Sequence, residues 1–146
     1  DVIQVFDTWG GVLAKEDYQE FAKPYLTELI QSIKGQVPTI VYCQNTRELL
    51  AELAETGCDL VSIDGDLPLC EAREKLDQKK IGLQGNLDPQ ILLTFPAKVR
   101  RETEVMLQGF SGELGYIANL GHGVMPRTPL DSVQAFVETV KDYRST

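Results

Sequence analysis

The sequence predicts an α/β fold in which helices cover a parallel β-sheet. Three observations support this expectation. The 146-residue chain has five short runs rich in β-branched or aromatic residues, amphipathic helical patterns separate them, and the order strand then helix occurs five times. Consecutive parallel strands need a crossover connection, which the helical patterns supply.

The expected strands end in polar residues or glycine and lie at Val2–Phe6, Thr39–Tyr42, Leu60–Ile63, Ile81–Leu83 and Tyr116–Asn119. The expected helices carry apolar residues at helical spacing and cover 15–34, 46–56, 68–76, 96–108 and 129–144. Thr46 is the expected N-cap of the second helix and Gly57 its C-cap. Each of the last three helices has a proline near its start, where the missing N–H costs no hydrogen bond.

Five such units fit two architectures. One is a doubly wound sheet of flavodoxin type, and the other is the last five units of an eight-stranded (β/α)8 barrel. A barrel uses about 31 residues per unit, so five units would take about 155. Both architectures bind ligands at the C-terminal ends of their strands, so we expect the functional residues there. Because Asp1 almost directly precedes the first strand, we expect a fragment of a longer protein, residues 1–146 forming one part of its domain.

The composition excludes several classes of protein. Acidic residues outnumber basic ones 22 to 14, and the net charge of −8 argues against binding to nucleic acid or to an anionic membrane. No apolar run is long enough to span a membrane, and the first residues lack a signal-peptide pattern. The three cysteines, Cys43, Cys58 and Cys70, form no CxxC pair, so we expect reduced structural thiols in a cytosolic protein.

The residues after the first three strands offer alternatives. Asp7 and Thr8 either present a hydroxyl and backbone N–H groups to an anion or cap the following turn. Tyr42–Asn45 supplies neutral hydrogen-bonding groups, and Arg47 beyond it either meets a carboxylate or is solvated. The acidic pair after the third strand, Asp64 and Asp66, either serves acid–base or cation chemistry or forms the turn.

The last two strand ends are more specific. Gln84–Pro89 is expected to form a turn in which Asp88 caps a helix that begins at Pro89. His122, the only histidine of the chain, lies between two glycines and has room to reach a ligand.

Three blocks of sequence resemble the uroporphyrinogen decarboxylase family, namely Phe6–Leu13, Leu83–Pro89 and Asn119–Gly123, supported by Ala54–Asp59 between them. The resemblance covers the whole chain and corresponds to the C-terminal two-fifths of a family member. It implies a (β/α)8 barrel and a cytoplasmic homodimer with facing active-site clefts. It also implies a carboxy-lyase of haem biosynthesis that uses no metal or organic cofactor. The family converts uroporphyrinogen III to coproporphyrinogen III by removing the carboxyl groups of four acetate side chains.

The resemblance also assigns residues. Thr8 corresponds to a Ser/Thr hydroxyl that contacts the tetrapyrrole, and His122 to a histidine that contacts a substrate carboxylate. No metal ligand and no catalytic residue is expected in this fragment, because the family's pyrrole-binding Asp, its arginine pair and its active-site Tyr belong to the N-terminal portion. The chain departs from the family pattern in having Gln44 where a Lys is usual and Gly65 where a Trp is usual.

Two alternatives remain at this stage. The first is a zinc-dependent corrinoid methyltransferase of the same superfamily, which would need a His-x-Cys pair and a later Cys. Here no cysteine follows Cys70. The second is a non-catalytic half-barrel that binds a partner or serves as a scaffold through its free sheet edges.

Overall fold

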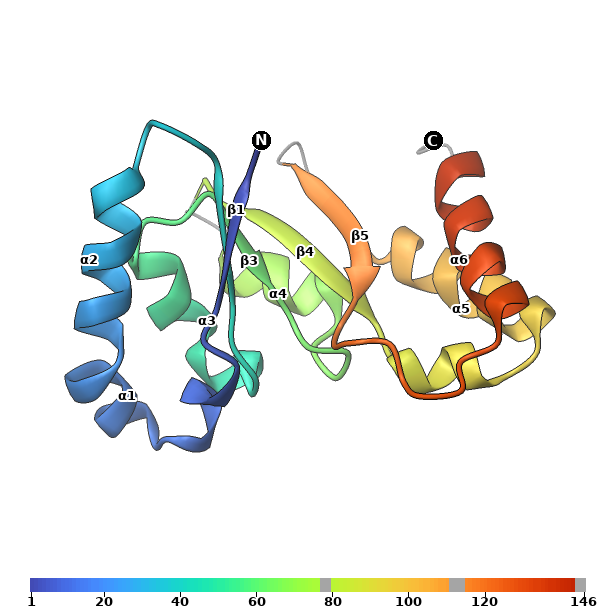
Figure 1. Cartoon of the computed structure of the whole chain (residues 1–146), viewed down its shortest axis with the longest axis horizontal. Helices are drawn as coiled ribbons and strands as arrows, with labels where there is room; N and C mark the ends of the chain where they lie inside the picture. Colours follow the sequence, from blue (N-terminus) through green and yellow to red (C-terminus); the bar gives the residue numbers. More distant parts are fainter. Residues whose placement is uncertain (77–79, 111–114, 144–146) are drawn as a thin grey trace.

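The strand order decides between the two architectures. The computed structural model describes residues 1–76, 80–110 and 115–143, and five strands of this part form one parallel sheet in the order β1-β2-β3-β4-β5 (Figure 1). A flavodoxin-type sheet would instead place β1 between β2 and β3. The order is that of consecutive units of a (β/α)8 barrel, so the barrel expectation is confirmed. The strands are β1 (Ile3–Phe6), β2 (Thr39–Tyr42), β3 (Leu60–Ser62), β4 (Gly82–Leu87) and β5 (Tyr116–Leu120).

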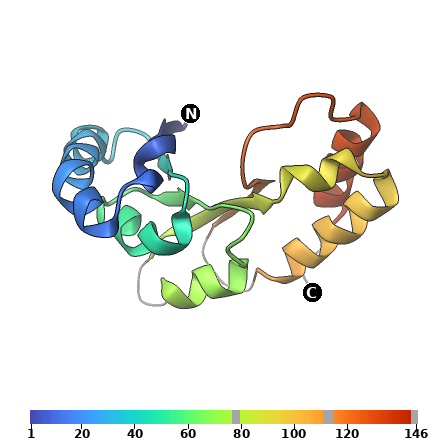
Figure 2. The same ribbon diagram turned by 90° about the horizontal axis from the view of Figure 1, so that it is seen from below.

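The helices lie around one side of the curved sheet, as Figure 2 shows from below. Two 3-10 helices, η1 and η2, directly follow Asp7 and Asp88. The Asp88 carboxylate accepts a hydrogen bond from the Gln90 N–H at 2.8 Å, so the predicted cap ahead of Pro89 is confirmed. The helices are η1 (Thr8–Val12), α1 (Lys15–Phe21), α2 (Lys23–Ile33), α3 (Thr46–Glu55), α4 (Leu69–Lys75), η2 (Pro89–Leu93), α5 (Pro96–Gln108) and α6 (Leu130–Asp142).

The helix expected over 15–34 is two helices, so that prediction was wrong. The break falls at Ala22, which ends α1 and precedes α2. Pro24 explains it, because a proline has no N–H to donate to the preceding turn and fits only the first turn of a helix. The prolines predicted to open later helices behave in the same way. Pro96 begins α5, and Pro68 and Pro129 occupy the positions just before α4 and α6. The last residue predicted for α6, 144, lies outside the described residues.

The caps predicted for α3 were each displaced by one residue. Asn45, not Thr46, is the N-cap, in a left-handed conformation with φ of 57°. Asparagine adopts this conformation more readily than most residues. At the other end Thr56 is the C-cap and Gly57 follows it, with φ of 84°. The glycine therefore ends the helix as expected, but from the position after the cap.

Strand β4 is longer than the sequence predicted. Residues 84–87 were expected to form a turn, but they continue the strand and pair with β5, with Gly85 opposite Ala118 and Leu87 opposite Leu120. Gly85 allows a close approach to the other neighbour, since a Cβ atom there would lie 2.9 Å from the Ile63 carbonyl oxygen. Gly85 therefore permits this close contact from within the strand rather than from a turn after it.

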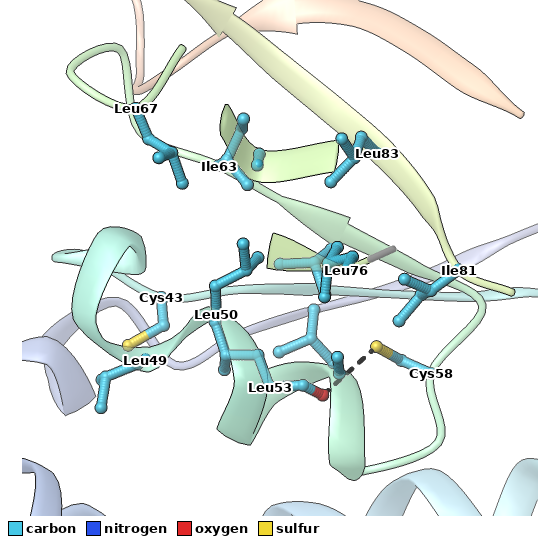
Figure 3. Close-up of a cluster of buried hydrophobic side chains, with 14 of the residues drawn as sticks. Cys43, Leu49, Leu50, Leu53, Cys58, Ile63, Leu67, Leu76, Ile81 and Leu83 are labelled. Carbon is cyan, nitrogen blue, oxygen red and sulfur yellow. Dashed lines mark hydrogen bonds between the residues drawn. The ribbon is translucent and has the colours of Figure 1, made fainter. Parts of the chain in front are cut away.

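The main core lies between the sheet and the helices that cover it (Figure 3). Side chains such as Leu50 and Leu53 of α3 pack against the β3–β4 region at Ile63 and Leu83, and each is at most 1% exposed. Burying one such side chain contributes about 1.5–3 kcal/mol. Cys58 belongs to this core, with its thiol 3.6 Å from the Leu53 carbonyl oxygen. None of the helices in the described ranges has the length and apolar character that a membrane span requires.

The opposite face of the sheet carries polar residues at a central level. The buried amide of Gln84 lies 3.2 Å from the Gln4 Oε1 atom and 3.1 Å from the Ser62 hydroxyl, so strands β1, β3 and β4 are linked across this face. Phe6 extends from the same face and is 68% exposed. This face would form the inside of a barrel, and the hydrogen bonds across it make that inside polar.

Candidate functional site

A cleft of about 640 Å³ lies at the C-terminal ends of the strands. Loops that follow all five strands line it, through Gly11 after β1, Gln44 and Asn45 after β2, Asp64 and Asp66 after β3, Asp88 after β4 and His122 after β5. This is the end at which α/β sheets and barrels bind ligands. The predicted location of the functional residues is therefore a real concavity.

The loop after β5 is the feature that shapes the cleft. In a flat sheet the ends of β2 and β5 would lie about 14 Å apart, because three inter-strand spacings separate them. Instead the loop crosses toward β2, where the Tyr42 hydroxyl is 3.4 Å from the Gly121 carbonyl oxygen. Gly121 passes directly against the β3 loop, since a Cβ atom there would lie 2.3 Å from the Gly65 nitrogen. A glycine is required at this crossing.

His122 is exposed, and its ring contacts Gly123, Gln44 and Tyr42. Its Nδ1 atom accepts a hydrogen bond from the Gly123 N–H at 2.7 Å, and its Nε2 atom lies 3.1 Å from the Gln44 amide nitrogen. The ring meets the Tyr42 ring edge-on, with centroids 6.1 Å apart. The glycines on either side leave the imidazole accessible, as the sequence predicted, and the ring has one fixed orientation at the cleft.

Thr8 begins η1, and Asp7 alone separates it from Phe6 at the end of β1. Its carbonyl oxygen accepts a hydrogen bond from the Gln44 N–H at 3.2 Å, and its side chain is half-buried. Among the described residues, Thr8 is not part of the cleft lining but adjoins it through Gln44. Thr8 and His122, which the sequence singled out at opposite ends of the chain, thus both contact one residue.

The buried Tyr42 and the partly buried Asp64 form a polar pair. The Tyr42 hydroxyl donates to Asp64 Oδ1 at 3.2 Å, while Asp64 Oδ2 accepts the Thr46 N–H at 3.0 Å. Burial raises the pKa of Tyr42 well above its usual value, and the Asp64 charge raises it further, so the hydroxyl remains a neutral donor. Asp64 therefore holds β2, β3 and the start of α3 together. The structure favours the structural alternative for this carboxylate.

Asp7 also has a structural contact, although not the predicted one. It occupies the N-cap position of η1 but makes no side-chain capping bond, and its Oδ2 atom accepts the hydroxyl of buried Tyr18 at 3.1 Å. Next to this pair, burial and the charge of Asp7 raise the pKa of the Cys43 thiol to about 12. Cys43, Cys58 and Cys70 are all free thiols; the first two are buried, whereas Cys70 is exposed on α4.

The charges of the cleft are mostly negative. Asp64, Asp66 and Asp88 line it, whereas the nearby Arg47 is paired with Glu71 and donates to the Asp66 carbonyl oxygen. The carboxylate alternative for Arg47 is thus confirmed. Within residues 1–76, 80–110 and 115–143, no three His, Cys, Asp or Glu side chains are placed to hold a metal ion. These strand ends therefore offer an anion hydrogen-bond donors rather than cations.

Comparison with known proteins places the chain in a family. The profile described as "Uroporphyrinogen decarboxylase (URO-D)" matches residues 1–143. The chain belongs to the uroporphyrinogen decarboxylase family. It is 40% identical to the uroporphyrinogen decarboxylase of Christiangramia forsetii, with 99% of this chain and 42% of the relative covered. It is 37% identical to those of Vesicomyosocius okutanii and Legionella pneumophila strain Paris, over 98% and 97% of this chain and 42% and 41% of the relatives.

The chain thus spans about two-fifths of the length of its uroporphyrinogen decarboxylase relatives. A methyltransferase from Methanosarcina mazei shares the fold, with a TM-score of 0.81 over 97% of this chain and 42% of that one. At 24% identity this likeness concerns the fold alone. The predicted family and the predicted barrel architecture are both confirmed.

Sequence reasoning did not assign a role to Gln44. The sequence showed it as one of several neutral polar residues after β2 and as a departure from the family's usual Lys, whereas in the structure both Thr8 and His122 contact it. The available signal was its position, directly past the C-terminal end of a buried parallel strand. The crossing of the β5 loop, which brings His122 to it, has no signature beyond Gly121.

Proposed function

We propose that this chain supplies one wall of the substrate site of a uroporphyrinogen decarboxylase, a carboxy-lyase that converts uroporphyrinogen III to coproporphyrinogen III. The observation that carries the proposal is the convergence of Thr8 and His122 on Gln44, at the strand ends where a barrel binds its substrate. The family resemblance matches these same two residues to contacts with the tetrapyrrole. Neither residue needs to take part in proton transfer for this role.

The chemistry requires a flexible, carboxylate-rich macrocycle to be held in one pose while a pyrrole ring is protonated and CO2 leaves. A hydroxyl and an imidazole are suited to holding carboxylate side chains, and a fixed pose lowers the barrier by orienting the reacting ring. The cleft itself carries Asp64, Asp66 and Asp88. The cations that offset the substrate's charge must therefore come from other parts of the complete protein, where the resemblance places an arginine pair.

The test is steady-state turnover of uroporphyrinogen III by the complete protein that contains this chain. We expect His122→Ala and Thr8→Ala each to lower kcat/KM about tenfold or more, because each removes a hydrogen bond to a charged substrate group. Thr27→Ala is the matched control for the threonine, because Thr27 lies on α2 and its hydroxyl donates to the Lys23 carbonyl oxygen of the same helix. Unchanged kinetics in both site variants would refute the assignment of these residues.

The proposal includes a cytoplasmic homodimer with facing clefts and no bound metal or organic cofactor, as the family resemblance implies. Light scattering on the complete protein should give twice the mass of one chain, and a monomer at micromolar concentration would remove the dimer from the proposal. Metal analysis of the active protein checks the other part, since zinc at one equivalent per chain would favour a metal-dependent relative.

A further inference from the structure

The backbone of Gln44 is locked in place by the loop after β1. Its N–H donates to the Thr8 carbonyl oxygen at 3.2 Å. On the other side, Gly11 approaches so closely that a Cβ atom added there would lie 1.8 Å from the Gln44 carbonyl oxygen. The side chain, by contrast, projects into the cleft and ends beside His122. The amide of Gln44 is therefore carried by a backbone that Thr8 and Gly11 hold in position.

The contact with Gly123 selects the tautomer of a neutral His122 ring. Because Nδ1 accepts the Gly123 N–H at 2.7 Å, a neutral ring must carry its proton on Nε2. The Gln44 amide lies beside this Nε2, with 3.1 Å between the two nitrogens; its NH2 group carries two protons and its oxygen can accept one. Two groups that can each donate a hydrogen bond therefore lie side by side at the cleft. Asp64 lines the same cleft, but its hydrogen bonds within the described residues come from the Tyr42 hydroxyl and the Thr46 N–H, not from this pair.

We infer that Gln44 is a further substrate-binding residue, and that its amide and the His122 imidazole together bind one carboxylate of the substrate. A carboxylate has two oxygens, each able to accept a hydrogen bond, which matches a pair of neighbouring donors. Two hydrogen bonds also compensate in part for the acidic residues that line the same cleft. The identity of the ligand rests on the proposed function, whereas the two-donor geometry does not.

Kinetics of two Gln44 variants of the complete protein test this inference. Gln44→Met keeps the length of the side chain but removes the donor, and we expect KM to rise about tenfold with kcat nearly unchanged. Gln44→Glu removes the donor and adds a negative charge, so its KM should rise further. Gln36→Met is the matched control, because Gln36 precedes β2 and bonds to Ser32 on α2, at the other end of the strand.

The Gln44→Glu variant distinguishes direct binding of the substrate by Gln44 from a role in which Gln44 only orients the His122 ring. If Gln44 only accepted the Nε2 proton of His122 and held the ring, the carboxylate of Gln44→Glu would serve that purpose and KM would stay near the wild-type value. That result would overturn the inference, as would an unchanged KM in Gln44→Met. Equal thermal unfolding of both variants and the wild type shows that a change in KM is not a folding defect.

A second measurement does not depend on turnover. In the complete protein labelled with ¹⁵N, citrate serves as a simple carboxylate, and the His122→Gln and Gln44→Met variants assign the two side-chain signals. We expect the His122 Nε2–H and the Gln44 amide signals to shift together with the same citrate dependence, and not with chloride. If they do so while uroporphyrinogen is not converted, the proposed function fails and the two-donor site stands. A shift of His122 alone would overturn the site.

Discussion

At the scale of single residues, the cleft depends on a glycine, Gly121, at the point where two loops cross. Gly121 crosses the β3 loop with no room for a Cβ atom, since the nearest atoms would be the Gly65 nitrogen at 2.3 Å and its Cα at 2.8 Å. Both are backbone atoms, so no side-chain rotation could relieve the overlap. The crossing places His122 next to Gln44. The relative position of these two side chains therefore depends on a residue without a Cβ atom at position 121.

Replacing Gly121 by alanine should therefore destabilise the protein and displace the loop. We expect Gly121→Ala to lower the free energy of unfolding by about 1–3 kcal/mol, the usual range for overpacking, as measured by urea denaturation of the complete protein. Gly123→Ala is the control in the same loop, because an added Cβ there meets no atom within 4 Å among the described residues other than those of its own chain neighbours. Its effect should stay within about 0.5 kcal/mol. Equal losses in the two variants would show that the close contact has no energetic importance.

The sequence could identify Thr8 and His122 but not their relation. A hydroxyl and an imidazole after buried strands, each close to glycines, are visible in the chain and match a family pattern. Their meeting at Gln44 depends on how far the β5 loop travels across the sheet, and that distance is a property of the tertiary structure. For the same reason the alternatives for Asp64 stayed open until its partners, the Tyr42 hydroxyl and the Thr46 N–H, were known.

At the scale of elements, an ion-pair cluster joins the first three α-helices. Glu52 of α3 is buried and contacts Lys23 of α2 at 2.6 Å and Lys15 of α1 at 3.3 Å. Burial alone would raise the pKa of Glu52, but hydrogen bonds from Lys23, Gln19 and Lys15 outweigh it and lower the pKa below its usual value. The charged carboxylate therefore stabilises the packing of these helices.

Replacing Glu52 by glutamine should reduce stability in a pH-dependent way. A lowered pKa in the folded state means that the contribution is present at neutral pH and is lost as pH falls from about 4.5 through the folded pKa. We expect Glu52→Gln to cost about 1–2 kcal/mol at pH 7 in urea unfolding, and the difference from the wild type to shrink as the pH is lowered below 4.5. Glu55→Gln is the control, because Glu55 shares Lys23 but its side chain is 50% exposed. A difference that stays constant with pH would contradict the assigned charge.

Element types were more predictable than element limits. Strand and helix patterns fixed the order of units because burial imposes a period on the sequence. The break at Ala22 was missed because the apolar spacing continues across it, although Pro24 was a visible warning. The extension of β4 through Gln84 and Asn86 was missed because polar residues and a glycine usually end a strand, whereas here pairing with β5 and buried hydrogen bonds retain them.

At the scale of the whole molecule, the curvature of the sheet makes the site. Consecutive strands are neighbours throughout, and loops from all five lead into one cleft, which places residues from both ends of the chain within reach of one ligand. The same curvature leaves an inner face with a polar link from Gln4 to Gln84 and an exposed Phe6. A macrocycle bound at this mouth would meet both the donors of the loops and the top of that face.

The most direct measurement is the structure of the complete protein with its tetrapyrrole product, coproporphyrinogen III, bound. The account predicts that the macrocycle lies over the C-terminal ends of β1 to β5, with a carboxylate oxygen within about 3.2 Å of His122 Nε2 and with Thr8 in contact with the ligand. A macrocycle bound elsewhere, with His122 and Thr8 both facing solvent, would contradict it.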